Sequence, residues 1–260
     1  MRSRRKRAAS PQRTEAPFLH RIQSLPDRFD RGKFPFNLRA FSQGIDLEFR
    51  STVTLFVGEN GSGKSTLLEA IAECCGFNPE GGSRDHHRTT VAGRSELAQA
   101  LRLSWLPKVT KGFFLRAESF YNFATSIEQV SDLRAYGGKS LHAQSHGESF
   151  LSLFAHRFEQ GIYILDEPEA ALSPQRQLSF LRIIHDLTAP KRAQFLIATH
   201  SPILLAYPGA VIFDLDGSTI QPTSYQETRH YLITRDFLNS PDRFFKHLLR
   251  RVEDPEGDDA

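Results

Sequence analysis

Gly58-Glu59-Asn60-Gly61-Ser62-Gly63-Lys64-Ser65 is the stretch that decides the fold. An apolar run at residues 53–57 precedes it, and an amphipathic segment at residues 66–75 follows it. This order predicts a strand, a glycine-rich loop and a helix, which is the context that a phosphate-binding P-loop requires. The glycines let backbone N–H groups turn inward around phosphate oxygens, and the start of the helix adds a partial positive charge.

Two side chains at the end of the loop suit a nucleotide and its metal ion. Lys64 can reach the outer phosphates, and the Ser65 hydroxyl can ligate Mg²⁺. The stretch therefore predicts a site for a nucleoside triphosphate with Mg²⁺. Its expected binding residues are Gly58, Glu59, Asn60, Gly61, Ser62, Gly63, Lys64, Ser65 and Thr66.

Two later strands end in residues that carry chemistry. The apolar run at residues 162–165 ends in Asp166 and Glu167, and the run at residues 195–198 is followed by His200. Asp166 is predicted to hold Mg²⁺, and Glu167 to orient or deprotonate the attacking water. His200 can hydrogen-bond the γ-phosphate and that water. A solvated strand end is the less common alternative for such acids, whereas a lone histidine is more often a core group. Here the carboxyl ends of parallel strands meet at one edge of the sheet, which favours a shared site.

The charges of the chain are concentrated at its two ends. The net charge at pH 7 is +3, yet residues 1–13 hold six basic and no acidic residues, so the remainder is net negative. A basic end of this kind can contact nucleic acid or anionic lipid, although a solvated, disordered terminus is the more ordinary interpretation. The other end is acidic, with Glu253, Asp254, Glu256, Asp258 and Asp259.

Length and cysteine content bound the class of protein. A chain of 260 residues fits one large domain or a domain with an inserted lobe. No apolar run approaches the length of a membrane span, and no apolar segment of a secretory signal follows the basic start. The two cysteines, Cys74 and Cys75, are adjacent and cannot form a disulfide that links distant segments, which favours a reducing compartment. We therefore expect a cytoplasmic protein.

The alternation of strands and helices predicts an α/β fold. We expect a mostly parallel sheet flanked by helices, with an antiparallel layer of N-terminal strands. The expected strands are residues 38–41, 45–49, 53–57, 113–116, 162–165, 194–198 and 211–215. The expected helices are residues 66–75, 95–105, 119–130, 147–160, 173–188, 201–206, 228–238 and 242–250.

The glycine-rich loop, Asp166-Glu167-Pro168 and Ala198-Thr199-His200-Ser201 together resemble the ABC class of P-loop ATPases. The resemblance covers about residues 21–250. Its phrases at residues 112–120 and 145–150 look like those of stand-alone bacterial ATPases close to the RecF and structural-maintenance-of-chromosomes (SMC) branch. It implies ATP and Mg²⁺ as ligands, and an ABC-type ATPase domain at residues 17–250 between disordered tails at 1–16 and 251–260. A small inserted helical lobe is expected at about 77–145.

The resemblance also implies a second copy of the chain. In the ABC class, a Leu-Ser-Gly-Gly-Gln signature at a helix start contacts the nucleotide of the partner subunit. Here Ser145 and Gly147 match the signature, whereas Gln144, His146 and Glu148 depart from it. Ser145 and Gly147 are thus expected to bind ATP across a head-to-tail homodimer, with residues 169–173 at the D-loop, where subunits meet.

Two further positions of the class are less well matched. The Q-loop glutamine has no clear counterpart, and Glu118 stands nearest to its place. Phe36, Arg39 and Phe41 are candidates for stacking on adenine.

Three functions remain open on the sequence. The first is an ABC-type ATPase whose ATP-driven dimerisation acts on nucleic acid or a protein partner. The second is the nucleotide-binding subunit of a membrane transporter, with a separate permease as partner. The third is an ATP-gated switch without turnover, against which Glu167 argues because a switch has less need of a general base. Residues 77–143 show no sustained heptads, which excludes long coiled-coil arms in that interval.

Overall fold

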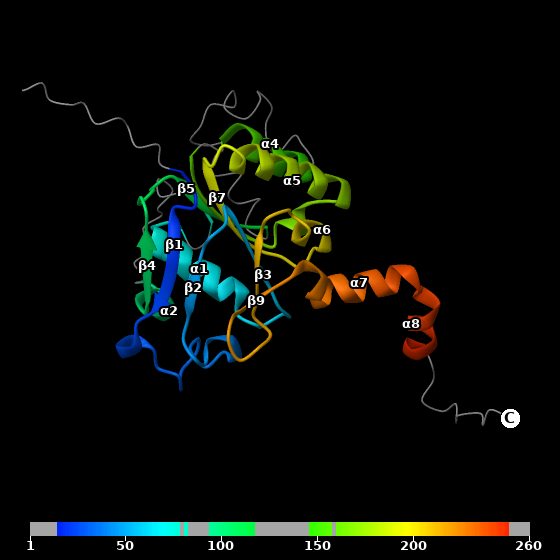
Figure 1. The fold of residues 1–260 in the computed structure, drawn as a ribbon, viewed down its shortest axis with the longest axis horizontal. Helices are drawn as coiled ribbons and strands as arrows, with labels where there is room; N and C mark the ends of the chain where they lie inside the picture. The colour runs from blue at the N-terminus through cyan, green and yellow to red at the C-terminus, as the bar shows by residue number, and fades with distance from the viewer. Residues whose placement is uncertain (1–14, 79–80, 83–93, 118–145, 158–159, 250–260) are drawn as a thin grey trace, which may run out of the picture.

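The computed structural model describes residues 15–78, 81–82, 94–117, 146–157 and 160–249. Within them the chain forms a six-stranded sheet flanked by helices and a smaller three-stranded sheet (Figure 1). This is the predicted α/β class, with a mainly parallel sheet and an antiparallel layer that includes N-terminal strands.

Six strands form the larger sheet, in the order β5-β6-β7-β3-β8-β9. Neighbours from β5 to β8 run parallel, and β9 runs antiparallel to β8. Every residue of β3, β6 and β7 is buried, as expected of parallel strands that are covered on both faces. The bounds are β3 Val53–Val57, β5 Gly112–Arg116, β6 Gly161–Asp166, β7 Ala193–Ala198, β8 Val211–Asp214 and β9 Gln221–Thr223.

Alternate residues of the central strands enter two separate cores. Phe56, Ile162 and Ile164 pack with α1 (Lys64–Cys75) on one face. Tyr163 and Leu165 pack on the other face with residues of the remaining flanking helices. These are α4 (His146–Arg157), α5 (Pro174–Thr188) and α6 (Pro202–Leu205). The two-residue period of a strand therefore sets which helices lie on which face.

The smaller sheet is antiparallel, with the order β2-β1-β4. Its strands are β1 (Leu19–Ser24), β2 (Asp46–Glu48) and β4 (Leu101–Trp105), and it packs on the α1 side of the larger sheet. The fully buried amide of Gln194, on β7, joins the two sheets. Its Oε1 accepts from the backbone N–H groups of Phe18 at 2.8 Å and Leu19 at 2.9 Å, and its Nε2 donates to the Leu19 carbonyl at 2.9 Å.

Two predicted elements are wrong. Residues 38–41 were expected as a strand but form the turn of 3₁₀ helix η2 (Arg39–Phe41), which buries Phe41 in the core. Residues 95–105 were expected as one helix, but only α2 (Glu96–Gln99) is helical, and β4 follows directly. Ser95 does cap α2, since its side chain accepts from the Ala98 N–H. Spacing of four residues fits a helix face, but it also fits one face of a strand, because four is a multiple of two.

The inserted lobe falls mostly outside the described residues. Within the expected range of 77–145, β4 belongs to the small sheet and β5 to the large one. The helix expected at residues 119–130 lies outside the part of the chain that the structure describes.

The C-terminal elements extend from the body of the molecule (Figure 1). A 3₁₀ turn, η7 (Tyr225–Glu227), leads into α7 (Arg229–Asn239) and α8 (Pro241–Leu248). Neither α7 nor α8 has a fully buried residue, and α8 packs on α7 through contacts of Phe237 with Phe244 and Phe245. Among the described residues, no helix has the length and apolar character needed to cross a membrane.

Candidate functional site

The glycine-rich loop joins β3 to α1 as the sequence predicts. Gly58 and Gly63 have φ angles of +150° and +102°, in the region that favours glycine. A Cβ at Gly58 would lie 2.6 Å from Ser62 Oγ, and one at Gly63 would lie 3.0 Å from the Phe41 ring. The loop is therefore held close to both neighbours, and α1 begins directly at Lys64. Glu59, Asn60 and Gly61 are exposed on the loop, and Thr66 is half-buried on α1.

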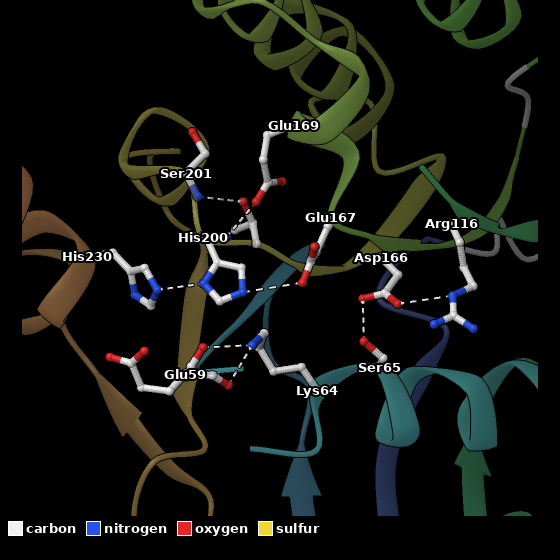
Figure 2. A network of polar contacts seen from close by, with 12 residues as sticks. Glu59, Lys64, Ser65, Arg116, Asp166, Glu167, Glu169, His200, Ser201 and His230 are labelled. Atoms are coloured by element: carbon white, nitrogen blue, oxygen red, sulfur yellow. Dashed lines mark hydrogen bonds and ion pairs between the residues drawn. The ribbon is translucent and has the colours of Figure 1, made fainter. Parts of the chain in front are cut away.

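Lys64 is folded back onto its own loop. Its Nζ donates to the Gly58 carbonyl at 2.7 Å and to the Glu59 carbonyl at 3.1 Å (Figure 2). The side chain is only 4% exposed, and this burial lowers the pKa of its ammonium, opposed by the nearby acids Glu167 and Asp166. A buried ammonium bonded only to carbonyls, with carboxylates close by, is a site prepared for anionic oxygens.

Ser65 and Asp166 meet where α1 starts and β6 ends. Ser65 Oγ donates to Asp166 Oδ1 at 3.2 Å. Burial raises the pKa of Asp166 to about 6, while the Ser65 hydroxyl and Arg116 act in the opposite direction. Arg116, at the end of β5, lies 3.5 Å from Asp166 Oδ2 (Figure 2). It also lies 2.7 Å from Glu69. The two predicted metal-binding residues are thus adjacent, with a guanidinium beside them.

Glu167 and His200 face each other from neighbouring strand ends. His200 Nε2 lies 3.3 Å from Glu167 Oε1. Glu167 has a φ of +50°, which is uncommon for a residue with a side chain and is a conformation that tertiary contacts must hold. Its N–H bonds to the Ala198 carbonyl at 2.9 Å, which fixes it to the strand that carries His200.

Glu169 follows the end of β6 and hydrogen-bonds to the residue after Thr199, beyond the end of β7. Its Oε1 accepts from the backbone N–H of His200 at 2.6 Å. Burial raises the pKa of this carboxyl, and the hydrogen bond from the His200 backbone opposes that rise. Glu169 lies in the 3₁₀ turn η6 (Pro168–Ala171), in the stretch matched to the D-loop, so a contact between this loop and His200 already exists in one subunit.

Four residues make contacts at the site that the sequence did not predict, although Glu169 was expected at the D-loop. Arg116 and Glu169 contact Asp166 and His200, as described above. Asp216 accepts from the Glu59 N–H at 2.6 Å and so supports the start of the loop. His230, on α7, lies 2.7 Å from His200, Nε2 to Nδ1 (Figure 2). Only the turn signal Asp216-Gly217 could have pointed to one of them, because the others contact the site through tertiary structure alone.

The signature stretch is only partly described. Gly147 is buried in the first turn of α4, where a Cβ would lie 2.6 Å from Arg176 Nη1 and 3.1 Å from the Ala171 carbonyl oxygen. Close packing against α5 and η6 therefore explains a glycine at this position. Ser145, Gln144 and the Q-loop candidate Glu118 lie outside the described residues. Of the adenine-stacking candidates, Phe36 and Phe41 are buried in the core and Arg39 is exposed.

The residues present fit a phosphate group and a hard cation. Ser62 Oγ is buried and finds no hydrogen-bond partner among the described residues, which suits a missing anionic acceptor. Ser65 and Asp166 offer two oxygen ligands of the kind that Mg²⁺ accepts together with phosphate oxygens and water. In the described part of the chain, no group of three or more His, Cys, Asp or Glu side chains is placed to hold a metal by itself.

Two family models match parts of the chain. Residues 36–128 match an AAA domain, and residues 141–206 match a model described as "AAA domain, putative AbiEii toxin, Type IV TA system". The first match contains the glycine-rich loop, and the second contains Asp166, Glu167 and His200. No curated protein matches the chain.

Several solved structures resemble the chain. CbiO1 from Clostridium perfringens, part of the ABC transporter complex cbiONQ, is 17% identical with a TM-score of 0.45, over 79% of this chain and 90% of that one. The SMC head domain from Thermotoga maritima is 13% identical with a TM-score of 0.44, over 80% and 98%. A bacterial ABC transporter cassette solved as a dimer is 16% identical with a TM-score of 0.42, over 71% and 90%.

The two family models and the geometry of the site agree with the resemblance expected from the sequence. The glycine-rich loop, the acids at the end of β6 and the histidine after β7 lie together at the carboxyl ends of parallel strands. Together with the two AAA-domain matches, this arrangement agrees with the P-loop ATPase site that was expected from the sequence.

Proposed function

We propose that this chain binds ATP with Mg²⁺ and hydrolyses it to ADP and phosphate. The observation that carries the proposal is the meeting of two pairs at one edge of the sheet. Ser65 lies 3.2 Å from Asp166, and Glu167 lies 3.3 Å from His200. The first pair suits a metal ion and the second a water molecule, and Lys64 lies beside both.

Binding would exchange internal contacts for contacts with phosphate. The ammonium of Lys64 would leave the carbonyls of Gly58 and Glu59 for the outer phosphates, and the Ser62 hydroxyl would gain an acceptor. Ser65 and Asp166 would hold Mg²⁺, which neutralises developing phosphate charge when it is bound. In a site this buried, such charge-assisted hydrogen bonds are stronger than at the surface.

Hydrolysis needs a group that orients a water molecule and accepts its proton. In this proposal the Glu167 carboxylate takes that role, since it is partly exposed, lies near Lys64 and is positioned by a strained backbone. The buried Nε2 of His200, which has no hydrogen-bond partner in the described residues, can donate to the same water or to a phosphate oxygen. Catalytic hydrogen bonds are often longer before substrate binds than after.

The proposal includes a second copy of the chain. Ser145 and Gly147 would contact ATP bound to the partner subunit, so that two nucleotides lie between two head-to-tail subunits. What supports this is the resemblance of residues 144–148 to the ABC signature and the place of Gly147 in the first turn of a helix, where free N–H groups favour phosphate. The ATP-driven cycle would then act on a nucleic acid or a protein partner.

ATP binding and dimerisation are tested together by light scattering. Glu167→Gln removes the proton acceptor but keeps its size, so we expect this variant to become a dimer in ATP with Mg²⁺ and to stay a monomer without nucleotide. The matched control is the double variant Lys64→Ala/Glu167→Gln, which should stay a monomer under both conditions because Lys64 is needed to hold ATP. A Glu167→Gln variant that binds ATP but remains a monomer would contradict the sandwich dimer.

A further inference from the structure

His200 is held between two partners in the described structure. Its Nε2 is buried and lies 3.3 Å from the carboxylate of Glu167, and its Nδ1 lies 2.7 Å from His230 Nε2 (Figure 2). The two imidazole rings have centroids 4.8 Å apart and planes inclined by 58°, which suits an edge hydrogen bond between the rings. His230 comes from α7, some thirty residues beyond the motif that contains His200.

Few protons are available to the row of three side chains formed by Glu167, His200 and His230. A neutral imidazole has one N–H donor and one acceptor nitrogen. The carboxylate of Glu167, 3.3 Å from Nε2, is negative and can only accept, so a neutral His200 faces it best with the proton on Nε2. Its Nδ1 is then an acceptor, and the 2.7 Å contact requires His230 Nε2 to be the donor. The opposite assignment would place the Nε2 lone pair of His200 against a carboxylate.

We propose that His230 is a positioning residue, which donates a hydrogen bond from its Nε2 to Nδ1 of His200 and thereby keeps the proton of His200 on Nε2. This inference rests on the proposed ATPase function for its kinetic consequence, but not for the tautomer itself. With His230 in place, His200 presents an N–H to the space beside Glu167, where it can donate to a phosphate oxygen or the attacking water.

The surroundings of His230 suit a fixed donor. Thr228, which is fully buried, caps α7 by accepting from the Tyr231 N–H, and it donates to the Tyr225 carbonyl at 2.7 Å. In the same turn, Arg229 lies 3.5 Å from Glu59 of the glycine-rich loop. The first turn of α7 is thus placed against both the phosphate loop and the strand end that carries His200.

The protonation state of His230 is also appropriate. Burial lowers the pKa of this imidazole, and the neighbouring His200 lowers it further. Both causes favour a neutral ring, which can hold its single proton on Nε2 and direct it to His200.

Nitrogen NMR of histidine side chains reads the tautomer directly, without any need for turnover. In protein labelled with ¹⁵N-histidine, with the His200 signals assigned by their loss in His200→Gln, we expect His200 to carry its proton on Nε2. In His230→Met, which has no donor at this position, the population should move toward the Nδ1–H form. A wild-type His200 protonated on Nδ1, or the same tautomer in wild type and His230→Met, would overturn the proposal.

Kinetics separate this positioning role from simple packing. Loss of the donor in His230→Met should lower kcat at least about tenfold with KM for ATP little changed, because tautomer errors at a catalytic histidine act on the chemical step. His230→Gln, whose amide nitrogen reaches the same place as Nε2, should keep kcat within about threefold of wild type. Equal losses in the Met and Gln variants would indicate a packing role and overturn the proposal.

A matched control variant distinguishes a loss of activity from a loss of folding. Ile233→Ala removes an exposed side chain of the same helix, one that has no assigned role at the site, and should leave kcat unchanged. Thermal melting of each variant establishes that it is folded before its rate is compared. If wild-type protein releases no phosphate, the proposed function fails alone, and the NMR measurement still decides whether His230 sets the tautomer of His200.

Discussion

Asp166 and Lys64 are buried ionisable residues that face the same small volume. Asp166 is 5% exposed and Lys64 is 4% exposed, and burial opposes the charged form of each. A protein that only needed stability would replace such groups with apolar ones, because desolvation costs several kcal/mol per charge. Their retention at one edge of the sheet fits a site that gains its proper partners, phosphate and a cation, from outside.

The raised pKa of Asp166 predicts how stability depends on pH in the absence of metal. The folded protein binds this proton more tightly than the unfolded chain does, so stability is lost as the pH rises through the window from about 4 to about 6. The shift from 3.8 to about 6 corresponds to about 3 kcal/mol. In EDTA, the free energy of unfolding of wild type relative to Asp166→Asn should therefore fall by most of this amount between pH 4 and pH 7.

Urea unfolding of both proteins across this range measures the difference. Asp166→Asn is the matched reference because it keeps the shape of the side chain and removes only its ionisation. A difference that stays constant with pH, or that grows in favour of wild type as the pH rises, would contradict a buried carboxyl with a raised pKa.

At the level of residues, local sequence was a good guide where a motif carries the chemistry. Lys64, Ser65, Asp166, Glu167 and His200 could be predicted because a glycine-rich loop and strand ends are recognisable from a few consecutive residues. Whether they act as expected remains a prediction. Arg116, Asp216 and His230 could not be assigned because each reaches the site by packing between segments that are distant in the chain. Glu169 was expected at the D-loop, but its bond to the His200 backbone was not.

At the level of elements, one glycine shows how closely β5 and β6 approach. Gly112 has a φ of +132°, and a Cβ there would lie 1.8 Å from the Ile162 carbonyl oxygen. Gly112→Ala therefore cannot be accommodated without moving β5, whose far end carries Arg116. We expect a loss of about 3 kcal/mol in stability and a fall in Tm of about 6–12 °C for a domain of this size.

Gly209→Ala is the matched control for this prediction. Gly209 also has a positive φ, +77°, but no atom lies within 4 Å of where its Cβ would be. Its substitution should cost only the conformational strain, about 1 kcal/mol. Differential scanning calorimetry of the two variants measures both values, and equal losses would show that the contact with Ile162 does not determine the requirement for glycine.

β1 and β4 are strands that the sequence did not predict. The predicted strands β3, β6 and β7 are apolar throughout because both of their faces are covered, and such runs are visible in the sequence. β1, with the sequence Leu-His-Arg-Ile-Gln-Ser, is half exposed and carries no such signal. The spacing of residues 97, 101 and 105 predicts a helix, but the pairing of β4 with β1 overrides that spacing.

At the level of the whole molecule, two sets of contacts join the candidate site to the small sheet and to the C-terminal helices. The buried amide of Gln194 bonds the N-terminal segment to β7, and so joins the small sheet to the strand that precedes His200. The first turn of α7 contacts both His200 and the glycine-rich loop. Beyond that turn, α7 and α8 extend from the body, and together with the residue that follows α8 they expose five large apolar side chains, Ile233, Leu238, Phe245, Leu248 and Leu249.

This arrangement places the first turn of α7 directly against His200, the candidate catalytic histidine. We call α7 and α8 together the helical arm. The fold class and the mainly parallel sheet were predicted from the order of apolar runs, which is a property of the whole chain. The arm's position was not, because helices without a buried face give no indication of where they dock.

The most direct test of the proposed activity is phosphate release by purified wild-type protein, Glu167→Gln and Lys64→Ala, measured with ATP in the presence of Mg²⁺ or EDTA. We expect wild type to release phosphate only with Mg²⁺. Glu167→Gln should lose at least about 100-fold in rate while still binding ATP, and Lys64→Ala should lose both binding and turnover. Wild-type protein that binds ATP without releasing phosphate, or Glu167→Gln that turns over at the wild-type rate, would contradict hydrolysis by this site.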